Sequence, residues 1–161
     1  MPTTLTDIRD FLNLRRIAMV GVSRNPKDFS RMLFRDMSAK GYDMVAVNPV
    51  ATELDGKRCF AHLQEIQPPV EGALIMTPPH QTEQLVQDCA QAGIRSVWMY
   101  RAGGQGSVTP AAVEFCRKHG IHLVEGHCPY MFLPHTPFFH RIHGFILKLT
   151  GAYPRETPRA A

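Results

Sequence analysis

The stretch Ile17-Ala18-Met19-Val20-Gly21-Val22-Ser23, followed by Arg24-Asn25-Pro26-Lys27-Asp28-Phe29-Ser30, decides the fold of this chain. It consists of an apolar strand over residues 17–22, a short polar turn and the beginning of a helix. Such a unit is typical of nucleotide sites, because the glycine lets the backbone approach a phosphate and the helix start supplies unpaired N–H groups. We therefore expect a ligand first at this turn.

Strand and helix signals alternate along the rest of the chain. Apolar runs at residues 44–47, 72–76, 96–100 and 122–124 predict four more strands, and helices are expected at residues 30–40, 81–92 and from 110 onward. Ser30 is predicted to cap the first of these helices. Strands that are apolar throughout and separated by helices form a parallel sheet covered on both faces. We predict an α/β fold, Rossmann-like and three-layered (α/β/α), with a five-stranded, mainly parallel sheet in the order 3-2-1-4-5.

The length of 161 residues, 44% of them hydrophobic, suits one compact domain. We expect it to span residues 1–152, with a short N-terminal helix and an amphipathic C-terminal helix from Pro137, and residues 153–161 to form a flexible tail. The apolar runs fall short of the roughly 18 residues that a membrane span needs, and no secretion signal begins the chain. Four widely spaced cysteines without a C-x-x-C motif indicate free thiols. These features predict a cytoplasmic protein without a transmembrane segment.

The carboxyl ends of the first four strands meet at one edge of the predicted sheet. The segments that follow these strands are Gly21 to Arg24, Asn48-Pro49, Thr77-Pro78-Pro79 and Arg101 to Gly104. Ligands of open α/β sheets bind outside such strand ends, so we expect the four segments to line one crevice.

The first turn departs from the fingerprint of dinucleotide-binding proteins. G-x-G-x-x-G with an acidic residue after the second strand would need a glycine at Ser23 and a carboxylate at Asn48. Ser23 is instead expected to donate to a phosphate. The cations of the turn and the following helix are Arg24, Lys27, Arg31 and Arg35. The turn cations Arg24 and Lys27 suit a ligand with an extra ribose phosphate, either coenzyme A or NADP. The helix cations Arg31 and Arg35 are equally well explained as part of a solvated helix face.

Several short motifs follow one another along the chain. They are Val20-Gly21-Val22-Ser23 with Pro26 and Ser30, Gly41-Tyr42, Val47-Asn48-Pro49, Gly56-Lys57, Thr77-Pro78-Pro79, Ala92-Gly93-Ile94, Val97-Trp98-Met99 and Cys128-Pro129. In combination they resemble the CoA-binding domain family, whose members look like the CoA-binding domain of the succinyl-CoA ligase α-subunit and of ADP-forming acyl-CoA synthetases.

The resemblance implies a binding site for coenzyme A. In it the turn from Gly21 to Arg24 meets the diphosphate, while Asn48-Pro49 flanks the adenosine. Residues 76–79, with Tyr100 and Arg101, bound the pantetheine path. The complete set of expected cofactor-binding residues is Gly21, Val22, Ser23, Arg24, Pro26, Lys27, Ser30, Asn48, Pro49, Met76, Thr77, Pro78, Pro79, Tyr100 and Arg101.

These features predict a protein that binds coenzyme A or an acyl-CoA at the carboxyl ends of the sheet, as a non-catalytic carrier, sensor or accessory module. An NAD(P)-binding oxidoreductase or redox sensor is the alternative. The net charge of +4 suits an anionic ligand. Basic residues are not interleaved with aromatic residues on any one strand, so nucleic-acid binding is not predicted. The histidines lack the spacing of a metal site. The protein partner would be a second copy of the chain or an enzyme that handles acyl-CoA.

Cys128 supports one further hypothesis. It follows the last predicted strand, so its thiol could reach the end of a pantetheine arm and act as a nucleophile or form a mixed disulfide with coenzyme A. A catalytic cysteine needs a base, and His127 is its neighbour in sequence. A structural thiol is the simpler interpretation, and we assign no catalytic residue.

Overall fold

The computed structural model describes residues 3–101 and 106–134, together with residues 154 and 156. The expected amphipathic helix from Pro137, most of the expected tail and the end of the fourth crevice segment at Gly104 lie outside the described residues. Within the part that is described, no helix is long and apolar enough to cross a membrane.

Seven strands of the described chain form one sheet, in the order β3-β4-β2-β1-β5-β6-β7. Their bounds are Arg16–Val20 for β1, Asp43–Val47 for β2, Glu53–Leu54 for β3, Lys57–Phe60 for β4, Gly72–Ile75 for β5, Ser96–Tyr100 for β6 and His122–His127 for β7. Neighbouring strands pair in parallel, except that β3 and β4 form an antiparallel hairpin.

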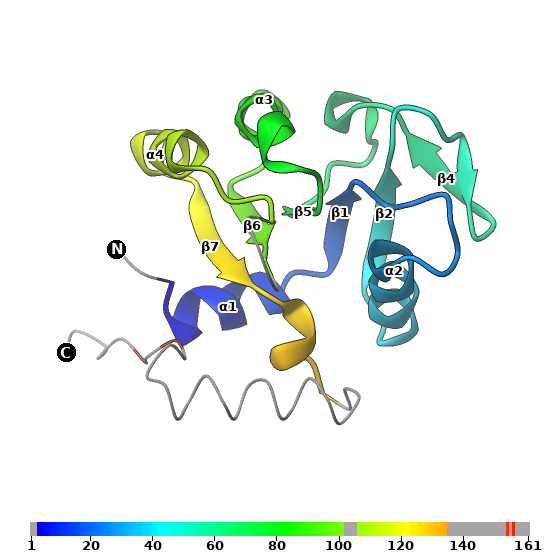
Figure 1. Cartoon of the computed structure of the whole chain (residues 1–161), viewed down its shortest axis with the longest axis horizontal. Helices are drawn as coiled ribbons and strands as arrows, with labels where there is room; N and C mark the ends of the chain where they lie inside the picture. Colours follow the sequence, from blue (N-terminus) through cyan, green and yellow to red (C-terminus); the bar gives the residue numbers. More distant parts are fainter. Residues whose placement is uncertain (1–2, 102–105, 135–153, 155, 157–161) are drawn as a thin grey trace.

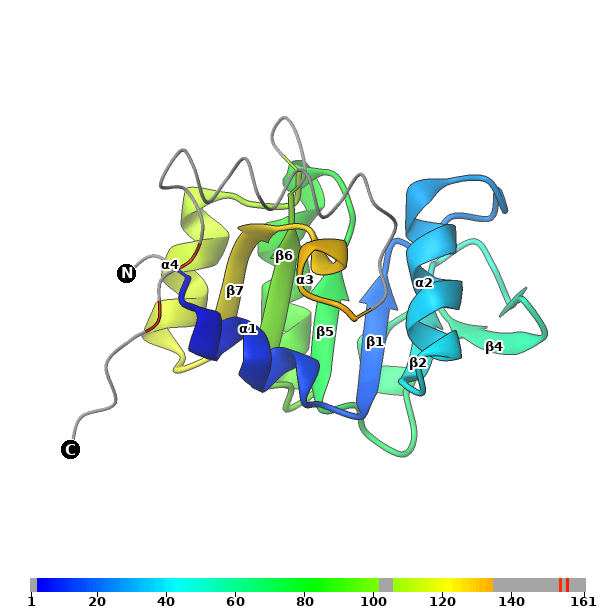
Figure 2. The ribbon, with the colours of Figure 1, turned by 90° about the horizontal axis from the view of Figure 1, so that it is seen from below.

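Helices cover both faces of this sheet. They are α1 Leu5–Leu12, α2 Phe29–Ala39, α3 Pro79–Gln91 and α4 Pro110–Lys118, with short 3-10 helices η1 at Leu63–Glu65 and η2 at Pro129–Met131. Figure 1 shows α3 and α4 on one face and α1 and α2 on the other. In Figure 2 the sheet is seen from the side of α1 and α2, with β1, β5, β6 and β7 side by side behind the helices. The predicted three-layer α/β/α architecture is confirmed.

Each central strand contributes to two cores, one on either face of the sheet. On β1, Ala18 and Val20 belong to the core under α3 and α4, whereas Ile17 and Met19 belong to the core under α1 and α2. All four side chains are at most 4% exposed. Because both faces are covered, these strands show continuous apolar runs rather than alternation of apolar and polar residues.

The sheet differs from the prediction in the identity of its third strand. The predicted third strand, residues 72–76, corresponds to β5, which pairs with β1 on the side opposite β2. The place beside β2 belongs to β4, which the prediction lacks. The five predicted strands therefore lie in the order 2-1-3-4-5, and the predicted order 3-2-1-4-5 is wrong; β4 and β3 extend the sheet beyond β2 to seven strands.

Strand β4, which the sequence analysis did not predict, follows a tight hairpin turn. Asp55 and Gly56 between β3 and β4 have φ values of 52° and 72°, as a type I′ turn requires at both central positions. An Asp-Gly pair is the sequence signal of such a hairpin, and a prediction built on apolar runs alone passes over it. The strand itself begins with exposed Lys57 and Arg58, so it lacks a buried apolar run.

Candidate functional site

The β1–α2 turn begins with a glycine that packs against the end of β5. Gly21 has a φ of +90°, and its N–H donates to the carbonyl of Val47 at 3.0 Å. A Cβ at this position would lie 2.9 Å from Cγ2 of Thr77 and 3.2 Å from the carbonyl carbon of Met76. Both the backbone conformation and this close approach favour glycine. The turn is thereby held between β1 and β5. These two neighbouring strands mark the point where the strand order of the sheet reverses.

Ser23 and Ser30 organise the rest of the turn. The prediction that Ser30 caps α2 is wrong, because α2 begins at Phe29 after Asp28 and the Ser30 hydroxyl accepts the N–H of Ser23 at 3.0 Å. The hydroxyl of Ser23 donates to Asp28 Oδ2 at 2.6 Å, and Asn25 Nδ2 donates to Asp28 Oδ1 at 2.8 Å. The Asp28 carboxylate makes no capping bond to α2. The first N–H groups of α2 therefore receive no capping bond from its N-cap residue, and such groups can bind an anion.

Asn48 connects the ends of β1 and β2. Its Nδ2 donates to the carbonyl of Val22 at 2.9 Å, and its Oδ1 accepts the N–H of Val50 at 2.9 Å. Both ends of the amide thus bond backbone, so the side chain positions the glycine turn and the corner at Pro49. An aspartate carboxylate, which has no donor, would lose the bond to Val22.

The four cations of the first βα unit fall into two pairs. Arg24 and Lys27 lie in the turn with exposed side chains. Arg31, only 7% exposed, donates from Nε and Nη2 to Asp55 at 2.6 and 2.9 Å, and Arg35 reaches the same carboxylate at 3.1 Å. Hydrogen bonds from Arg31 hold the pKa of Asp55 well below its usual range. The helix arginines are thus structural, whereas the turn cations form no ion pair with any of the residues that the structure describes.

A pocket of about 380 Å³ opens at the carboxyl ends of β1, β2 and β5. This volume lies within the range of small-molecule sites, about 300–1,000 Å³. The strand ends and the turns after them contribute Val20, Gly21, Val47, Asn48, Pro49, Met76, Thr77 and Pro78. The helix α3 contributes Gln81, Leu85 and Asp88, and the segment that leads from β4 into η1 contributes Ala61, His62 and Leu63. Most of these side chains are apolar, with polar groups at a few positions.

Six of the fifteen expected residues line this pocket, namely Gly21, Asn48, Pro49, Met76, Thr77 and Pro78. Those that do not are Val22, Ser23, Arg24, Pro26, Lys27 and Ser30 in and after the β1–α2 turn, Pro79 at the first position of α3, and Tyr100 and Arg101 at the end of β6. The prediction missed His62, which follows the unpredicted strand β4. It also missed Gln81, Leu85 and Asp88, whose i, i+4, i+7 spacing marks one face of a helix without showing what that face meets.

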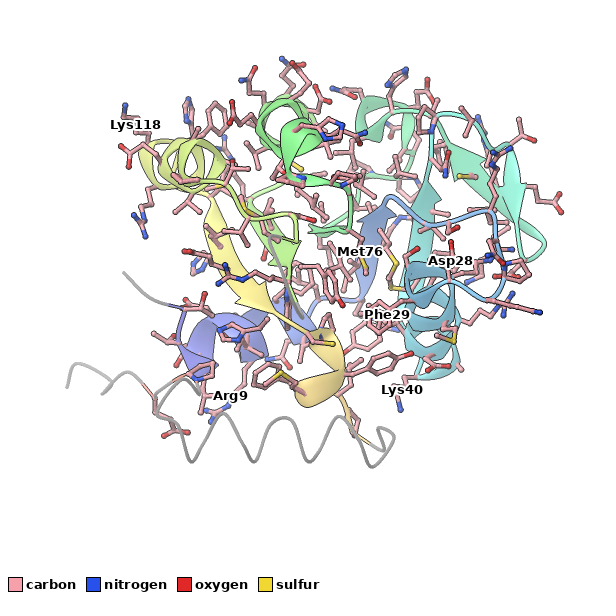
Figure 3. The ribbon with its side chains drawn as sticks, viewed as in Figure 1. Arg9, Asp28, Phe29, Lys40, Met76 and Lys118 are labelled. Atoms are coloured by element: carbon pink, nitrogen blue, oxygen red, sulfur yellow. The ribbon has the colours of Figure 1, made fainter. Side chains whose placement is uncertain are left out.

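An aromatic group lies near the end of β6, on the side of the sheet that faces α2. The ring of Phe29 is 5.3 Å from that of Tyr100 and 5.6 Å from that of Tyr130, centre to centre. Met76 packs against the same core as Phe29 and Tyr100 and also lines the pocket; Figure 3 shows Met76 and Phe29 in the middle of the molecule, near the start of α2. Burial raises the pKa of Tyr100 to about 12, so its phenol is neutral at physiological pH.

Ser107, which the sequence did not single out, joins the ends of β5 and β6. Its hydroxyl lies 3.0 Å from the carbonyl oxygen of Ile75 and 2.7 Å from that of Thr77, and its N–H donates to the carbonyl of Tyr100 at 2.8 Å. The side chain is 1% exposed. Within the described residues, the buried Oγ1 of Thr77 has no hydrogen-bond partner. Ser107 therefore fixes the backbone of the Thr77 turn, while the Thr77 hydroxyl finds no partner in the described part of the chain.

Arg101, Cys128 and His127 lie around the end of β7. Arg101 is exposed and approaches Gly126, where a Cβ would lie 3.1 Å from its Nη2. Burial, with a smaller contribution from Arg101, lowers the pKa of His127. Cys128 is 2% exposed, and burial raises the pKa of its thiol to about 11. A thiol that stays protonated at neutral pH is a poor nucleophile, which favours the structural interpretation of Cys128.

The chain matches a known protein family and several known proteins. The sequence profile of the family described as the CoA binding domain matches residues 15–134. The chain is similar to the α-subunit of the ADP-forming acetate–CoA ligase II of Pyrococcus furiosus, with 26% identity over 125 residues that cover 73% of this chain. It spans only 27% of the length of that subunit.

Two relatives of similar size also match. The uncharacterized protein YneT of Bacillus subtilis is 25% identical over 114 residues, which cover 71% of this chain and 82% of that protein. A solved structure of a hypothetical protein from Pyrococcus horikoshii superimposes with a TM-score of 0.73 and 25% identity, covering 80% of this chain and 91% of the other.

Proposed function

Because the chain belongs to the CoA binding domain family, we propose that it binds coenzyme A or an acyl-CoA at the carboxyl ends of β1, β2 and β5, as a non-catalytic carrier, sensor or accessory module. The observation that carries this proposal is the pocket of about 380 Å³ that adjoins the Gly21 turn. The neighbouring end of β2 presents Asn48, whose amide bonds backbone, where a redox dinucleotide site has a carboxylate.

Each part of the ligand has a matching part of the site. The apolar pocket suits the adenosine, and the turn after Gly21, with the uncapped N-terminus of α2, suits the diphosphate. Exposed Arg24 and Lys27 are placed to attract the ribose phosphate. The pantetheine arm would pass Met76 toward the aromatic group around Tyr100.

A non-catalytic role is supported by the state of the thiols. All four cysteines are buried and unpaired, as in a protein of the reducing cytoplasm, and the raised pKa of Cys128 leaves it without thiolate character. Similarity to a ligase α-subunit suggests that the protein partner is an enzyme that produces or consumes acyl-CoA.

A titration of the full chain with coenzyme A, acetyl-CoA, dephospho-CoA, NAD and NADP tests the proposal. We expect coenzyme A or acetyl-CoA to raise the melting temperature most, because a ligand at about a hundred times its Kd adds about 2.7 kcal/mol of stability. Dephospho-CoA should bind more weakly. Stabilisation by NAD or NADP without any effect of coenzyme A would overturn the proposal in favour of a redox dinucleotide protein.

A further inference from the structure

Polar side chains of the pocket gather between α3 and the segment before η1. Gln81 and Asp88 are two helical turns, roughly 10 Å, apart on one face of α3, with Leu85 between them. His62, in the segment before η1, also lines the pocket. At the strand ends, by contrast, the amide of Asn48 is already engaged with backbone.

Among the described residues that line the pocket, Asp88 is the one with a carboxylate side chain. Nε2 of Gln84, one turn earlier on α3, donates to Asp88 Oδ1 at 3.1 Å. One turn beyond Asp88, Oε1 of Gln91 accepts from Nε2 of Gln64 at 3.5 Å, which ties α3 to η1. The carboxylate is therefore held on a helix that is itself bonded to η1, which contributes Leu63 to the pocket.

We infer that Asp88 determines base specificity: its carboxylate accepts a hydrogen bond from the exocyclic amino group of an adenine bound between Leu63 and Leu85. This inference rests on the proposed binding of coenzyme A, and it assigns the residue that distinguishes the C6 amino group of adenine from the C6 carbonyl group of hypoxanthine. An ionised carboxylate can only accept hydrogen bonds. Adenine offers an amino donor at C6, whereas hypoxanthine offers a carbonyl oxygen that would face the carboxylate without a proton between them.

The same carboxylate sets the direction of the ligand. Asp88 repels phosphate groups, whereas the turn cations Arg24 and Lys27 attract them. The two cations follow Gly21, at the carboxyl end of β1, and Asp88 lies ten residues into α3, which starts at the carboxyl end of β5 and runs away from it. A nucleotide therefore enters with its base toward α3 and its phosphates toward the β1–α2 turn.

The test compares coenzyme A with the analogue in which hypoxanthine replaces adenine, both titrated into the full chain by isothermal calorimetry. We expect the wild type to bind the analogue at least about tenfold more weakly, because the carboxylate and the C6 carbonyl oxygen would face each other as two acceptors. Asp88→Asn, whose amide can donate to the C6 carbonyl, should bring the two affinities within about threefold of each other.

Glu83→Gln is the matched control, because it removes one negative charge from an exposed position of the same helix. It should keep the wild-type preference for adenine. Equal binding of coenzyme A and its analogue by the wild type would overturn the inference and leave the proposed function standing. A preference that survives in Asp88→Asn, in a variant with unchanged melting temperature, would equally remove Asp88 from this role. Failure of coenzyme A itself to bind would overturn the proposed function, and the inference with it.

Discussion

Arg31 and Asp55 form a two-point ion pair, 24 residues apart in sequence, that joins the start of α2 to the β3–β4 turn. A third donor of Arg31, Nη1, reaches the carbonyl of Ser23 at 2.9 Å. One buried guanidinium therefore contacts the β1–α2 turn and the hairpin that brings β4 beside β2. The shape of the ligand turn thus depends on a residue outside it.

Asp55→Asn should destabilise the protein by about 1–3 kcal/mol at pH 7, because it leaves the buried Arg31 without a charged partner. Asparagine tolerates the positive φ of this position, so the effect reports the charge. The pKa of Asp55 is depressed in the folded state. Its contribution is therefore complete above the unfolded value of about 3.9 and is lost as the pH falls below it.

Urea unfolding from pH 7 to pH 2.5 measures this effect. The difference in unfolding free energy between wild type and Asp55→Asn should shrink as the pH falls below about 4. Arg35→Met is the control, because Arg35 is 43% exposed and shares the same carboxylate; it should cost less than about 1 kcal/mol. A constant difference across the whole pH range would contradict the assigned ion pair.

Gly21→Ala should reduce both stability and ligand affinity. Alanine pays about 1–2 kcal/mol for the left-handed backbone conformation, and its Cβ would also press on Thr77 Cγ2 at 2.9 Å. Gly41→Ala has the same conformational cost, since Gly41 has a φ of +95°, but a Cβ at this position would have no neighbour within 4 Å. We expect Gly21→Ala to be the less stable variant in thermal unfolding and to lose coenzyme A binding, while Gly41→Ala keeps it. Equal behaviour of the two would argue against the close approach of the turn to β5.

Arg24→Ala should narrow the difference in affinity between coenzyme A and dephospho-CoA. Loss of a charge-assisted contact to the ribose phosphate predicts a roughly threefold to tenfold weaker binding of coenzyme A, with little change for dephospho-CoA. Lys118→Ala is the matched control, since Lys118 lies on α4 at the far side of the molecule from the β1–α2 turn (Figure 3). If both variants weakened the two ligands alike, the effect would come from net charge rather than from a local contact.

Thiol labelling tests the structural role of Cys128. With a pKa raised to about 11, the thiolate fraction at pH 7 is roughly two orders of magnitude below that of a free cysteine. The native protein should therefore react with an aromatic disulfide reagent at least about a hundredfold more slowly than it does in urea. Rapid native labelling that disappears in Cys128→Ser would restore the hypothesis of a nucleophilic thiol.

The parts of the candidate site that depend on residues adjacent in sequence could be predicted from the sequence. The positive φ at Gly21 and the placement of Asn48 and Thr77 at strand ends follow from local sequence and from the rule that parallel strands end at one edge. The strand β4 escaped prediction because its pairing with β2 is not encoded in its own hydrophobicity. The role of Ser30 was mistaken because a serine near a helix start serves equally as a cap or as a local acceptor.

The sequence by itself determined the succession of buried strands, glycine turns and helices, because backbone conformation and burial on both faces leave their pattern in adjacent residues. Only the tertiary structure decided that Arg31 would pair with Asp55, that Asn48 would bond the turn after β1, and that Asp88 and His62 would line one pocket. Those relationships join segments far apart in the chain. They arise from which surfaces pack when the chain closes on itself, and no local pattern records that choice.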